Sequence, residues 1–286
     1  NEKGEIEYIN PNFTKVTGYT YGEVVGKNPR ILKSGRQSSE FYADMWKSLR
    51  NEGHWSGEMW NKRKNGELYA VMKTICAICD ESGTTTHYVS VGSDITTLKK
   101  HQEELEHIAH YDTLTNLPNR SLLADRLLQS MLQCSRHKKS LAVVFLDLDG
   151  FKAVNDNYGH DAGDQVLRVF SKGLAEVFRG YDIIGRIGGE EFCVTLFDHD
   201  IEQAERIGEK LRQCISQHLY SYGDKRIELT LSVGICKYRD GDKLEALLKL
   251  ADVELYRAKK NGRNQVRICQ TDEHLQGSSE LTRQNS

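Results

Sequence analysis

Two hydrophobic patterns divide the chain near residue 97. Residues 1–97 begin with short elements and end in strand-like segments such as "LYAVMKTICAIC". Asn65-Gly66 and Ser82-Gly83 interrupt these segments, and such pairs are typical of hairpin turns. We therefore expect a first domain whose second half is a sheet of antiparallel hairpins.

The stretch 98–110 is rich in helix formers and predicts a helix that links two domains. Ile95, Leu98, Gln102, Leu105 and Ala109 recur three and four residues apart, which is the spacing of a coiled-coil seam. A polar glutamine in the seam fits a weak or switchable pairing of two copies. An ordinary amphipathic linker helix has the same spacing, so both interpretations stay open.

Residues 111–270 have a mixed pattern. Helices are predicted over 120–136, about 163–178, 201–219 and 243–262, and strands over 141–148 and 227–236. A hairpin around Gly188-Gly189 separates two further apolar segments. This order predicts an α+β domain with a largely antiparallel sheet, so the whole chain is a two-domain α+β protein. The polar stretch 271–286 predicts a disordered tail.

Composition and charge narrow the function classes. A net charge of -2 over 286 residues gives no electrostatic reason to expect nucleic acid or an anionic membrane as the main partner. No apolar run approaches the roughly 20 residues of a membrane helix, and no signal peptide is visible. The chain begins at Asn1, so we expect a cytoplasmic fragment of a protein that could be membrane-anchored upstream.

Seven cysteines are scattered through predicted strands and helices, which suits reduced thiols. Cys76 and Cys79 have CxxC spacing, but no second pair follows. In a strand their side chains would face opposite sides. We expect a structural role for this pair rather than metal or redox chemistry.

The segment "RIGGEEF", residues 186–192, places Glu190 and Glu191 beside a tight turn. Successive strand side chains point to opposite faces, so the two glutamates are not expected to serve one site together. A second source of carboxylates is "LAVVFLDLDG", a nearly continuous apolar strand that ends in Asp147 and Asp149. Asp147 and Glu190 on adjacent strands would suit Mg²⁺, which takes one or two protein carboxylates together with substrate phosphates. Alternatively, the two aspartates only cap a turn with Gly150.

Five segments match one family in order and spacing: "DTLTNLPNR", "FLDLDGFKAVNDNYGHDAGDQVL", "RGYDIIGRIGGEEF", "LTLSVGI" and "ADVELYRAKKNGRN". Over residues 111–270 the chain resembles the GGDEF family of diguanylate cyclases. The resemblance implies condensation of two GTP into cyclic di-GMP with release of two pyrophosphates, using Mg²⁺ or Mn²⁺. It also implies a homodimer in which each domain binds one GTP. Asn116 stands where the family usually has glycine, and asparagine tolerates the same left-handed backbone.

The resemblance implies the metal ligands and the base. Asp147 and Glu190 match the side-chain metal ligands, and Leu148 matches the position that offers its backbone carbonyl. Glu190 also matches the catalytic base for the attacking 3′-hydroxyl, where the family accepts Asp or Glu. Whether Glu190 takes the proton itself or only holds the metal that acidifies the hydroxyl stays open.

Three positions match contacts to the guanine base. Asn155 and Asp164 match residues that read its edge, and a carboxylate can accept from the N1 and N2 donors. His160 matches another substrate contact. Structural alternatives are a helix cap for Asp164 and a turn position for Asn155.

Four positions match contacts to phosphate. The resemblance implies that phosphate is bound by the main-chain amides of Phe151 and Lys152 and by the side chains of Lys259 and Arg263. The two cations also suit a helix C-terminus ended by Gly262, and both roles can coexist. No "GxxxxGK[ST]" loop is present, which argues against P-loop chemistry.

Arg179 and Asp182 form an RxxD motif that alone would predict only a surface ion pair. Its distance from the glycine pair matches the inhibitory product site of the family. At such a site an arginine can donate two parallel hydrogen bonds to guanine or phosphate. The resemblance therefore implies feedback inhibition by cyclic di-GMP.

Residues 1–97 resemble a PAS sensor domain through "EYINPNFTKVTGYTYGEVVGKNPRILKSG", "HWSGEMWNKRKNGE" and "HYVSVGSDIT". The first strand of that fold is expected to be missing or shortened. Trp55 and Asn61 fit a pattern shared with some flavin-binding members, but both could equally pack the core. The PAS ligand is therefore unknown, with flavin as a candidate, and no histidine suggests a haem ligand.

Several functions remain in competition. The leading prediction is a cyclase whose PAS state shifts the linker helix. A catalytically inactive GGDEF domain could instead act as a receptor for cyclic di-GMP, or the chain could be a PAS-driven scaffold. A cyclase that makes mixed dinucleotides is disfavoured by the carboxylate at Asp164, and no phosphodiesterase domain is visible.

Overall fold

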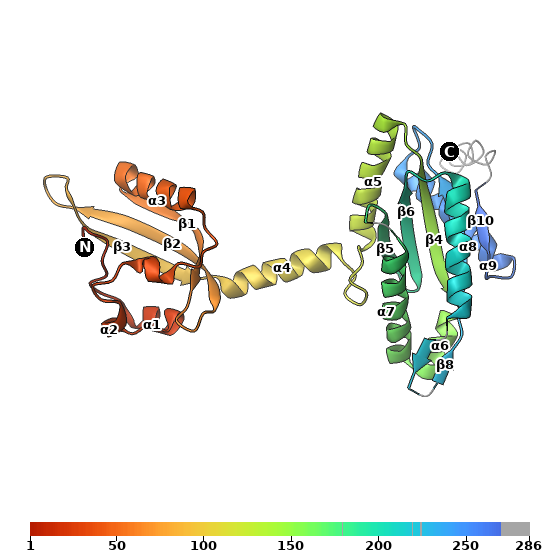
Figure 1. The fold of residues 1–286 in the computed structure, drawn as a ribbon, viewed down its shortest axis with the longest axis horizontal. Helices are drawn as coiled ribbons and strands as arrows, with labels where there is room; N and C mark the ends of the chain where they lie inside the picture. Colours follow the sequence, from red (N-terminus) through yellow and green to blue (C-terminus); the bar gives the residue numbers. More distant parts are fainter. Residues whose placement is uncertain (179, 219, 224, 270–286) are drawn as a thin grey trace, which may run out of the picture. The chain divides into compact units, whose positions relative to one another are not determined.

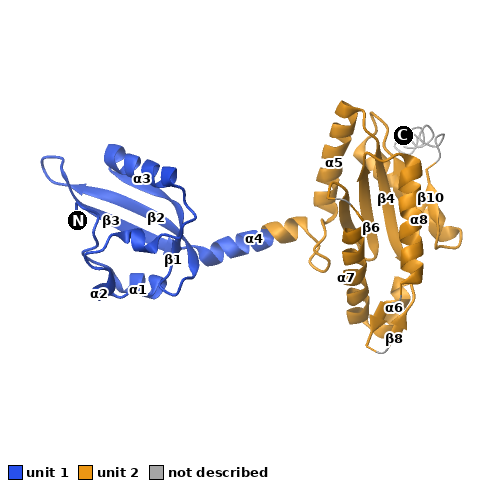
Figure 2. Cartoon of the chain, in the orientation of Figure 1, with its two compact units in different colours: residues 1–105 blue, residues 106–286 orange. Residues whose placement is uncertain are grey.

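The computed structural model describes residues 1–178, 180–218, 220–223 and 225–269. It forms two compact units, Asn1–Leu105 and Glu106–Ser286 (Figure 2). The unit boundary falls within α4 (Thr96–His110), the linker helix that the sequence predicted. Arg179 and the predicted disordered tail, 271–286, lie outside the described residues.

The first unit is built on a three-stranded antiparallel sheet in the order β1-β2-β3 (Figure 1). Its strands are β1 (His54–Lys62), β2 (Leu68–Cys79) and β3 (Thr85–Asp94). Both predicted turns are present, with Gly66 at φ 89° and Gly83 at φ 82°, where glycine has no steric cost. Residues 1–10 contain no strand.

Short helices precede this sheet and supply the rest of its core. They are α1 (Pro11–Thr17), α2 (Tyr21–Val24), the 3₁₀ helix η1 (Pro29–Leu32) and α3 (Ser39–Glu52). Ser38 caps α3 by accepting a hydrogen bond from the Phe41 N–H. Met45 and Leu49 of α3 are buried in one cluster with residues of the sheet's inner face, Met59, Tyr69 and Val71.

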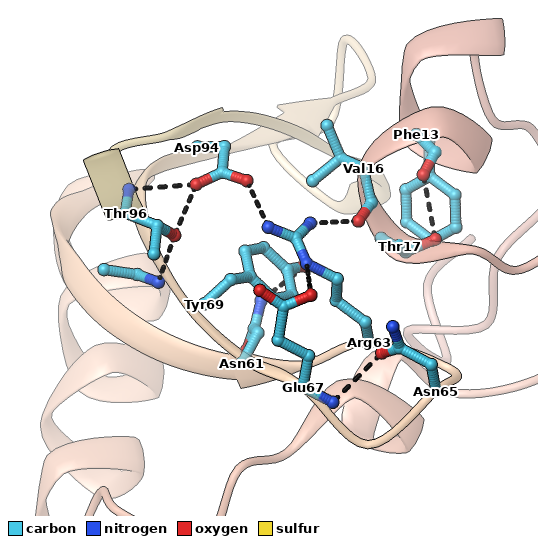
Figure 3. Close-up of polar contacts among 11 residues, drawn as sticks. Phe13, Val16, Thr17, Asn61, Arg63, Asn65, Glu67, Tyr69, Asp94 and Thr96 are labelled. Carbon is cyan, nitrogen blue, oxygen red and sulfur yellow. Dashed lines mark hydrogen bonds and ion pairs between the residues drawn. The ribbon is translucent and has the colours of Figure 1, made fainter. Parts of the chain in front are cut away.

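Asp94 joins the last strand of the first unit to α4 (Figure 3). One carboxylate oxygen accepts from the Thr96 N–H at 2.9 Å and from its hydroxyl at 2.5 Å, and the other accepts from Arg63 at 2.7 Å. Arg63 also donates to the Val16 carbonyl of α1, and the Ala70 N–H donates to the Thr96 hydroxyl at 3.0 Å. The beginning of α4 is thereby fixed to both the sheet and α1.

The second unit contains a five-stranded sheet in the order β10-β9-β4-β6-β5. The strands are β4 (Leu141–Asp149), β5 (Ile183–Gly188), β6 (Glu191–Phe197), β9 (Thr230–Lys237) and β10 (Val266–Ile268). Only the pairing of β10 with β9 is parallel, which confirms the predicted largely antiparallel sheet. A separate two-stranded hairpin pairs β7 (Tyr220–Tyr222) with β8 (Lys225–Ile227).

Helices cover both faces of this sheet, and β4 is buried along its whole length. One face packs against α5 (Arg120–His137) and α9 (Leu244–Lys260), and the other packs against α7 (His160–Val177) and α8 (Ile201–Gln217) (Figure 1). Alternate β4 residues belong to different cores: Phe145 contacts the α5–α9 cluster, and Leu146 the α7–α8 cluster. In the part of the chain described, no helix is both long and apolar enough to cross a membrane.

Some predicted boundaries are wrong. The predicted strand over 227–236 is interrupted between β8 and β9, α7 begins at His160, and a short helix that the sequence did not predict, α6 (Phe151–Tyr158), follows β4. The hairpin turn lies at Gly189-Glu190, because a bulge between Arg186 and Gly188 shifts the register and pairs Gly188 with Glu191.

Candidate active site

The buried end of β4 carries the two predicted aspartates, which are only 4% and 7% exposed. Asp147 lies two residues after Phe145 on β4, so both side chains point to the same face of the sheet, which α9 covers. Lys259, in the last turn of α9, places its Nζ 2.6 Å from the Asp147 Oδ2. The structure thus brings two predicted site residues, 112 positions apart, into a direct ion pair.

Gly234 of β9 explains why α9 lies close enough for this pair. A Cβ at Gly234 would be 2.3 Å from the Ala251 carbonyl oxygen and 2.3 Å from the Leu255 nitrogen. Only glycine allows the backbone of the helix to rest on the strand in this way. The position of Lys259 therefore depends on a glycine far from it in sequence.

Asp149 has a different role from Asp147. It accepts hydrogen bonds from Thr230 Oγ1 at 2.8 Å, Ser232 Oγ at 2.7 Å and the Asn264 N–H at 3.0 Å, and Arg263 Nε lies 4.0 Å away. Arg263 and Asn264 both adopt left-handed backbone, with φ of 61° and 45°. Asp149 thus stabilises the strained turn that carries Arg263, a role beyond the turn cap with Gly150 that the sequence suggested.

Glu190 lies in the hairpin turn, and its carbonyl accepts from the Leu148 N–H at 3.4 Å. The next residue, Glu191, pairs with Asp147 across β4 and β6. Burial raises the pKa of Asp147 to about 6; the ammonium of Lys259 opposes this shift, and the charges of both glutamates add to it. The prediction that strand alternation separates the two glutamates is wrong, because Glu190 is not in the strand.

Arg186, which the sequence did not single out, positions this turn. Its Nε and Nη2 donate to the Gly189 carbonyl at 2.9 and 2.8 Å, and its Nη1 donates to Asp112 at 2.8 Å. Asp112 also accepts from the Thr115 N–H at 2.9 Å. The turn that carries Glu190 is therefore tied to the segment that follows α4, through a contact between residues 74 positions apart.

The donor set at the end of β4 suits a hard divalent cation. Asp147 and Glu190 offer carboxylate oxygens and Leu148 a backbone carbonyl, and Mg²⁺ typically needs only one or two carboxylates beside substrate oxygens. The ammonium of Lys259 already places a positive charge against Asp147. Within the described ranges, no group of three or more His, Cys, Asp or Glu side chains forms an all-protein metal cage.

The predicted substrate contacts gather around α6 and α7. Gly150, at φ 77°, turns the chain from β4 into α6, so the amides of Phe151 and Lys152 begin a helix and lack intrahelical partners. Asn155 lies in the same helix, partly buried, and its Oδ1 lies against Gly163 of α7. Asp164 is the next residue of α7 and is also partly buried.

Two other predictions find less support in the geometry. His160 is the exposed first residue of α7, and no hydrogen bond of its side chain is found among the described residues. Asp182 accepts a hydrogen bond from the Phe197 N–H at 3.4 Å, while its predicted partner Arg179 lies outside the described residues. The RxxD product site therefore stays a prediction.

The PAS positions have protein partners. Asn61 is 5% exposed and donates to the Tyr69 hydroxyl at 3.4 Å. The Trp55 ring packs edge-on against Phe41, with centroids 5.8 Å apart. These contacts favour the core-packing interpretation, and flavin binding stays untested.

Comparison with known proteins identifies both regions. Residues 109–265 match the model of the diguanylate cyclase GGDEF domain. The chain belongs to the GGDEF family. Residues 1–97 match a PAS domain model. The family resemblance that the sequence motifs suggested is therefore confirmed for both regions.

Individual relatives agree with this assignment. The chain is 41% identical over 170 residues, 59% of its length, to the bifunctional diguanylate cyclase/cyclic di-GMP phosphodiesterase MucR of Pseudomonas aeruginosa, of which it spans 25%. It is 29% identical over 274 residues to a diguanylate cyclase of Vibrio cholerae, covering 94% of this chain and 84% of that protein. The chain spans only about a quarter of MucR and of two other relatives from Pseudomonas aeruginosa.

Solved structures show the same GGDEF fold. The coiled coil and GGDEF domain of DgcB from Caulobacter crescentus, in complex with c-di-GMP, matches with a TM-score of 0.56 and 27% identity, covering 61% of this chain and 93% of that one. The active GGEEF domain of a Vibrio cholerae diguanylate cyclase matches with a TM-score of 0.51 and 31% identity, covering 54% and 98%. That domain has the same GGEEF signature as residues 188–192 here.

Proposed function

We propose that this chain is a diguanylate cyclase that condenses two GTP molecules into cyclic di-GMP and releases two pyrophosphates. The observation that carries the proposal is the buried carboxylate of Asp147, held against Lys259 beside the Glu190 turn. A structural ion pair would not need two further carboxylates close by. A site that holds a divalent cation and a triphosphate would use all of these groups.

Each predicted residue then has a role at the end of β4. Asp147, Glu190 and the Leu148 carbonyl would hold Mg²⁺ or Mn²⁺, which supplies charge stabilisation at the α-phosphate. Glu190 would receive the proton of the 3′-hydroxyl or hold the metal. Further contacts come from the Phe151 and Lys152 amides, from Lys259 and Arg263 on phosphate, and from Asn155, His160 and Asp164 on the base and nearby groups.

Catalysis would need two copies, because each GGDEF domain holds one GTP and the two nucleotides must meet. Leu98 and Leu105 of α4 are 65% and 67% exposed in the single chain, as expected for residues of a seam between copies. The PAS unit would act on this pairing through the Asp94 junction at the start of α4. Insertions that break the seam should change turnover while GTP affinity per subunit stays the same.

Incubation with GTP and Mg²⁺, followed by chromatographic identification of the products, tests this function. Wild-type protein should yield cyclic di-GMP and pyrophosphate. Glu190→Gln should lower the rate by about 10³-fold or more, since a metal-assisted step loses several kcal/mol. Glu176→Gln, an exposed glutamate on α7, should leave the rate unchanged. Absence of cyclic di-GMP from the wild-type reaction would contradict the proposal.

Feedback inhibition is the finer part of the proposal. Cyclic di-GMP should inhibit the wild-type enzyme through Arg179 and Asp182, and Arg179→Ala should abolish this inhibition. A receptor without catalysis is the second candidate, favoured by the family resemblance of that pair. It would bind cyclic di-GMP yet leave GTP intact, so the same two assays separate the candidates.

A further inference from the structure

Gly163, in the first turn of α7, is buried and packs closely against side chains of α6. A Cβ at this position would lie 2.0 Å from Asn155 Oδ1, 3.1 Å from Asn155 Cγ and 3.0 Å from Phe151 Cζ. Carbon and oxygen atoms in ordinary contact lie well beyond 3 Å from each other. The carboxamide of Asn155 therefore occupies the space that a side chain at position 163 would fill.

Backbone conformation does not explain this glycine. Gly163 is helical and has no left-handed φ, so any residue could adopt its backbone geometry. Glycine is a poor helix former, and the second glycine of α7, Gly173, has no atom within 4 Å of the Cβ that it lacks. Of these two glycines only Gly163 is buried, and only there does the missing Cβ make room for another residue.

The side chain that uses this room is not committed to the fold. Asn155 is partly buried, and among the described residues its carboxamide has no hydrogen-bond partner. It therefore keeps two donors and an acceptor for a ligand. Asp164, directly after Gly163, adds a partly buried carboxylate from the adjoining helix.

We infer that Gly163 is a positioning residue for nucleobase recognition: it lets the Asn155 carboxamide pack between α6 and α7 in the orientation that reads the base. This inference rests on the proposed GTP site and deepens it. A carboxamide donor and a neighbouring carboxylate complement a guanine edge, which combines an acceptor at O6 with donors at N1 and N2. Adenine has the opposite arrangement at its 6-position, so a displaced Asn155 should weaken the preference for GTP over ATP.

A double-mutant cycle tests the inference in the full chain. We expect Gly163→Ala to raise the KM for GTP about tenfold with a smaller change in kcat, and to reduce the GTP-over-ATP preference by a similar factor. Asn155→Ala should do the same. The double variant should match Asn155→Ala alone, because removal of the carboxamide makes room for the new methyl group. Gly173→Ala is the matched control and should keep wild-type KM and selectivity.

Additive effects of the two substitutions would overturn the inference, since Gly163 would then act through general packing. Wild-type selectivity in Gly163→Ala would overturn it as well.

Circular dichroism melting separates misfolding from displacement of Asn155. If Gly163→Ala alone unfolds, the double variant should recover the melting temperature, and failure to recover counts against the inference. If calorimetry shows that the wild-type protein binds a non-hydrolysable GTP analogue but no turnover is found, the proposed reaction is wrong. The four proteins of the cycle are then compared by their dissociation constants for that analogue instead of by KM. Absence of both turnover and binding would overturn both proposals.

Discussion

The two units each place a carboxylate at the end of a strand and a basic side chain against it, yet the two carboxylates are opposite in character. Asp94, the last residue of β3, receives Arg63 and both donors of Thr96. Burial raises the pKa of Asp94, but the hydrogen bonds from Thr96 and Arg63 outweigh it and leave that pKa below its usual value. At Asp147, near the end of β4, burial prevails despite Lys259 and the pKa rises to about 6.

The difference lies in the neighbours. Asp94 is surrounded by donors supplied by the fold, so its charge is compensated and its role is architectural. Asp147 has one donor and lies near two further carboxylates, Glu190 and Glu191, so a negative charge there is under-compensated. A divalent cation bound there, as proposed above, would compensate this negative charge.

The largest effect that should distinguish the two carboxylates is catalytic. Asp147→Asn keeps the size of the side chain but weakens the metal site, so cyclase activity should fall by about 10³-fold. The melting temperature should change little, because loss of the ion pair with the partly exposed Lys259 is offset by removal of a buried charge that two nearby glutamates repel. Turnover and circular dichroism melting check both expectations, with Asp125→Asn, an exposed aspartate on α5, as the control. Full activity in Asp147→Asn would refute the metal-site assignment.

The reciprocal change should affect stability instead. Asp94→Ala removes the acceptor of both Thr96 donors and one of the acceptors of Arg63, which should cost the first unit about 1–2 kcal/mol. All three tryptophans, Trp46, Trp55 and Trp60, lie in that unit, so their fluorescence during urea unfolding reports on it alone.

The contribution of Asp94 to the stability of the first unit should also depend on pH, in a direction that its pKa fixes. The pKa of Asp94 in the folded chain lies below its ordinary value of 3.8, so its stabilising contribution is present above 3.8 and is lost as pH falls through the lower folded value. Asp94→Ala should lack this acid-sensitive component. Asp44→Asn, on the exposed side of α3, should behave as wild type. An equally stable Asp94→Ala protein would show that Asp94 is not architectural.

The sequence predicted those elements and site residues whose signal lies in consecutive positions of the chain. The apolar run 141–148, the amphipathic helix predicted over 201–219 and the motif spacing led to β4, α8 and the choice of Asp147, Glu190 and Lys259. Hydrophobic periodicity and family motifs carry that information in consecutive residues.

Contacts between distant residues were beyond such reasoning. The partners of Asp149 lie 81 to 115 positions away, and Arg186 reaches Asp112 over 74 positions. The hairpin turn was misplaced by one residue because a bulge leaves no clear trace in the hydrophobic pattern. Alternate polar residues on β9, Thr230 and Ser232, were the one available hint that a buried carboxylate faces that strand.

A smaller effect on stability should come from replacing Lys73, a cationic side chain that is not paired with a carboxylate among the described residues. Lys73 lies on the same face of β2 as Val71 and Ile75, flanked across the sheet by Gly57 and Gly92. Burial lowers its pKa, and among the described residues it forms no ion pair. Lys73→Met should therefore stabilise the first unit by about 1 kcal/mol at neutral pH, measured by tryptophan fluorescence in urea.

The sign of the pH dependence makes this prediction specific. The folded pKa of Lys73 lies below its ordinary value of 10.5, so the cost of its charge is present at neutral pH and disappears as pH rises through the folded value toward 10.5. The advantage of Lys73→Met should shrink over that range. Lys62→Met, at the exposed end of β1, should show neither the gain nor its pH dependence. A destabilised Lys73→Met protein would instead show that the ammonium makes a favourable contact that outweighs the cost of its burial.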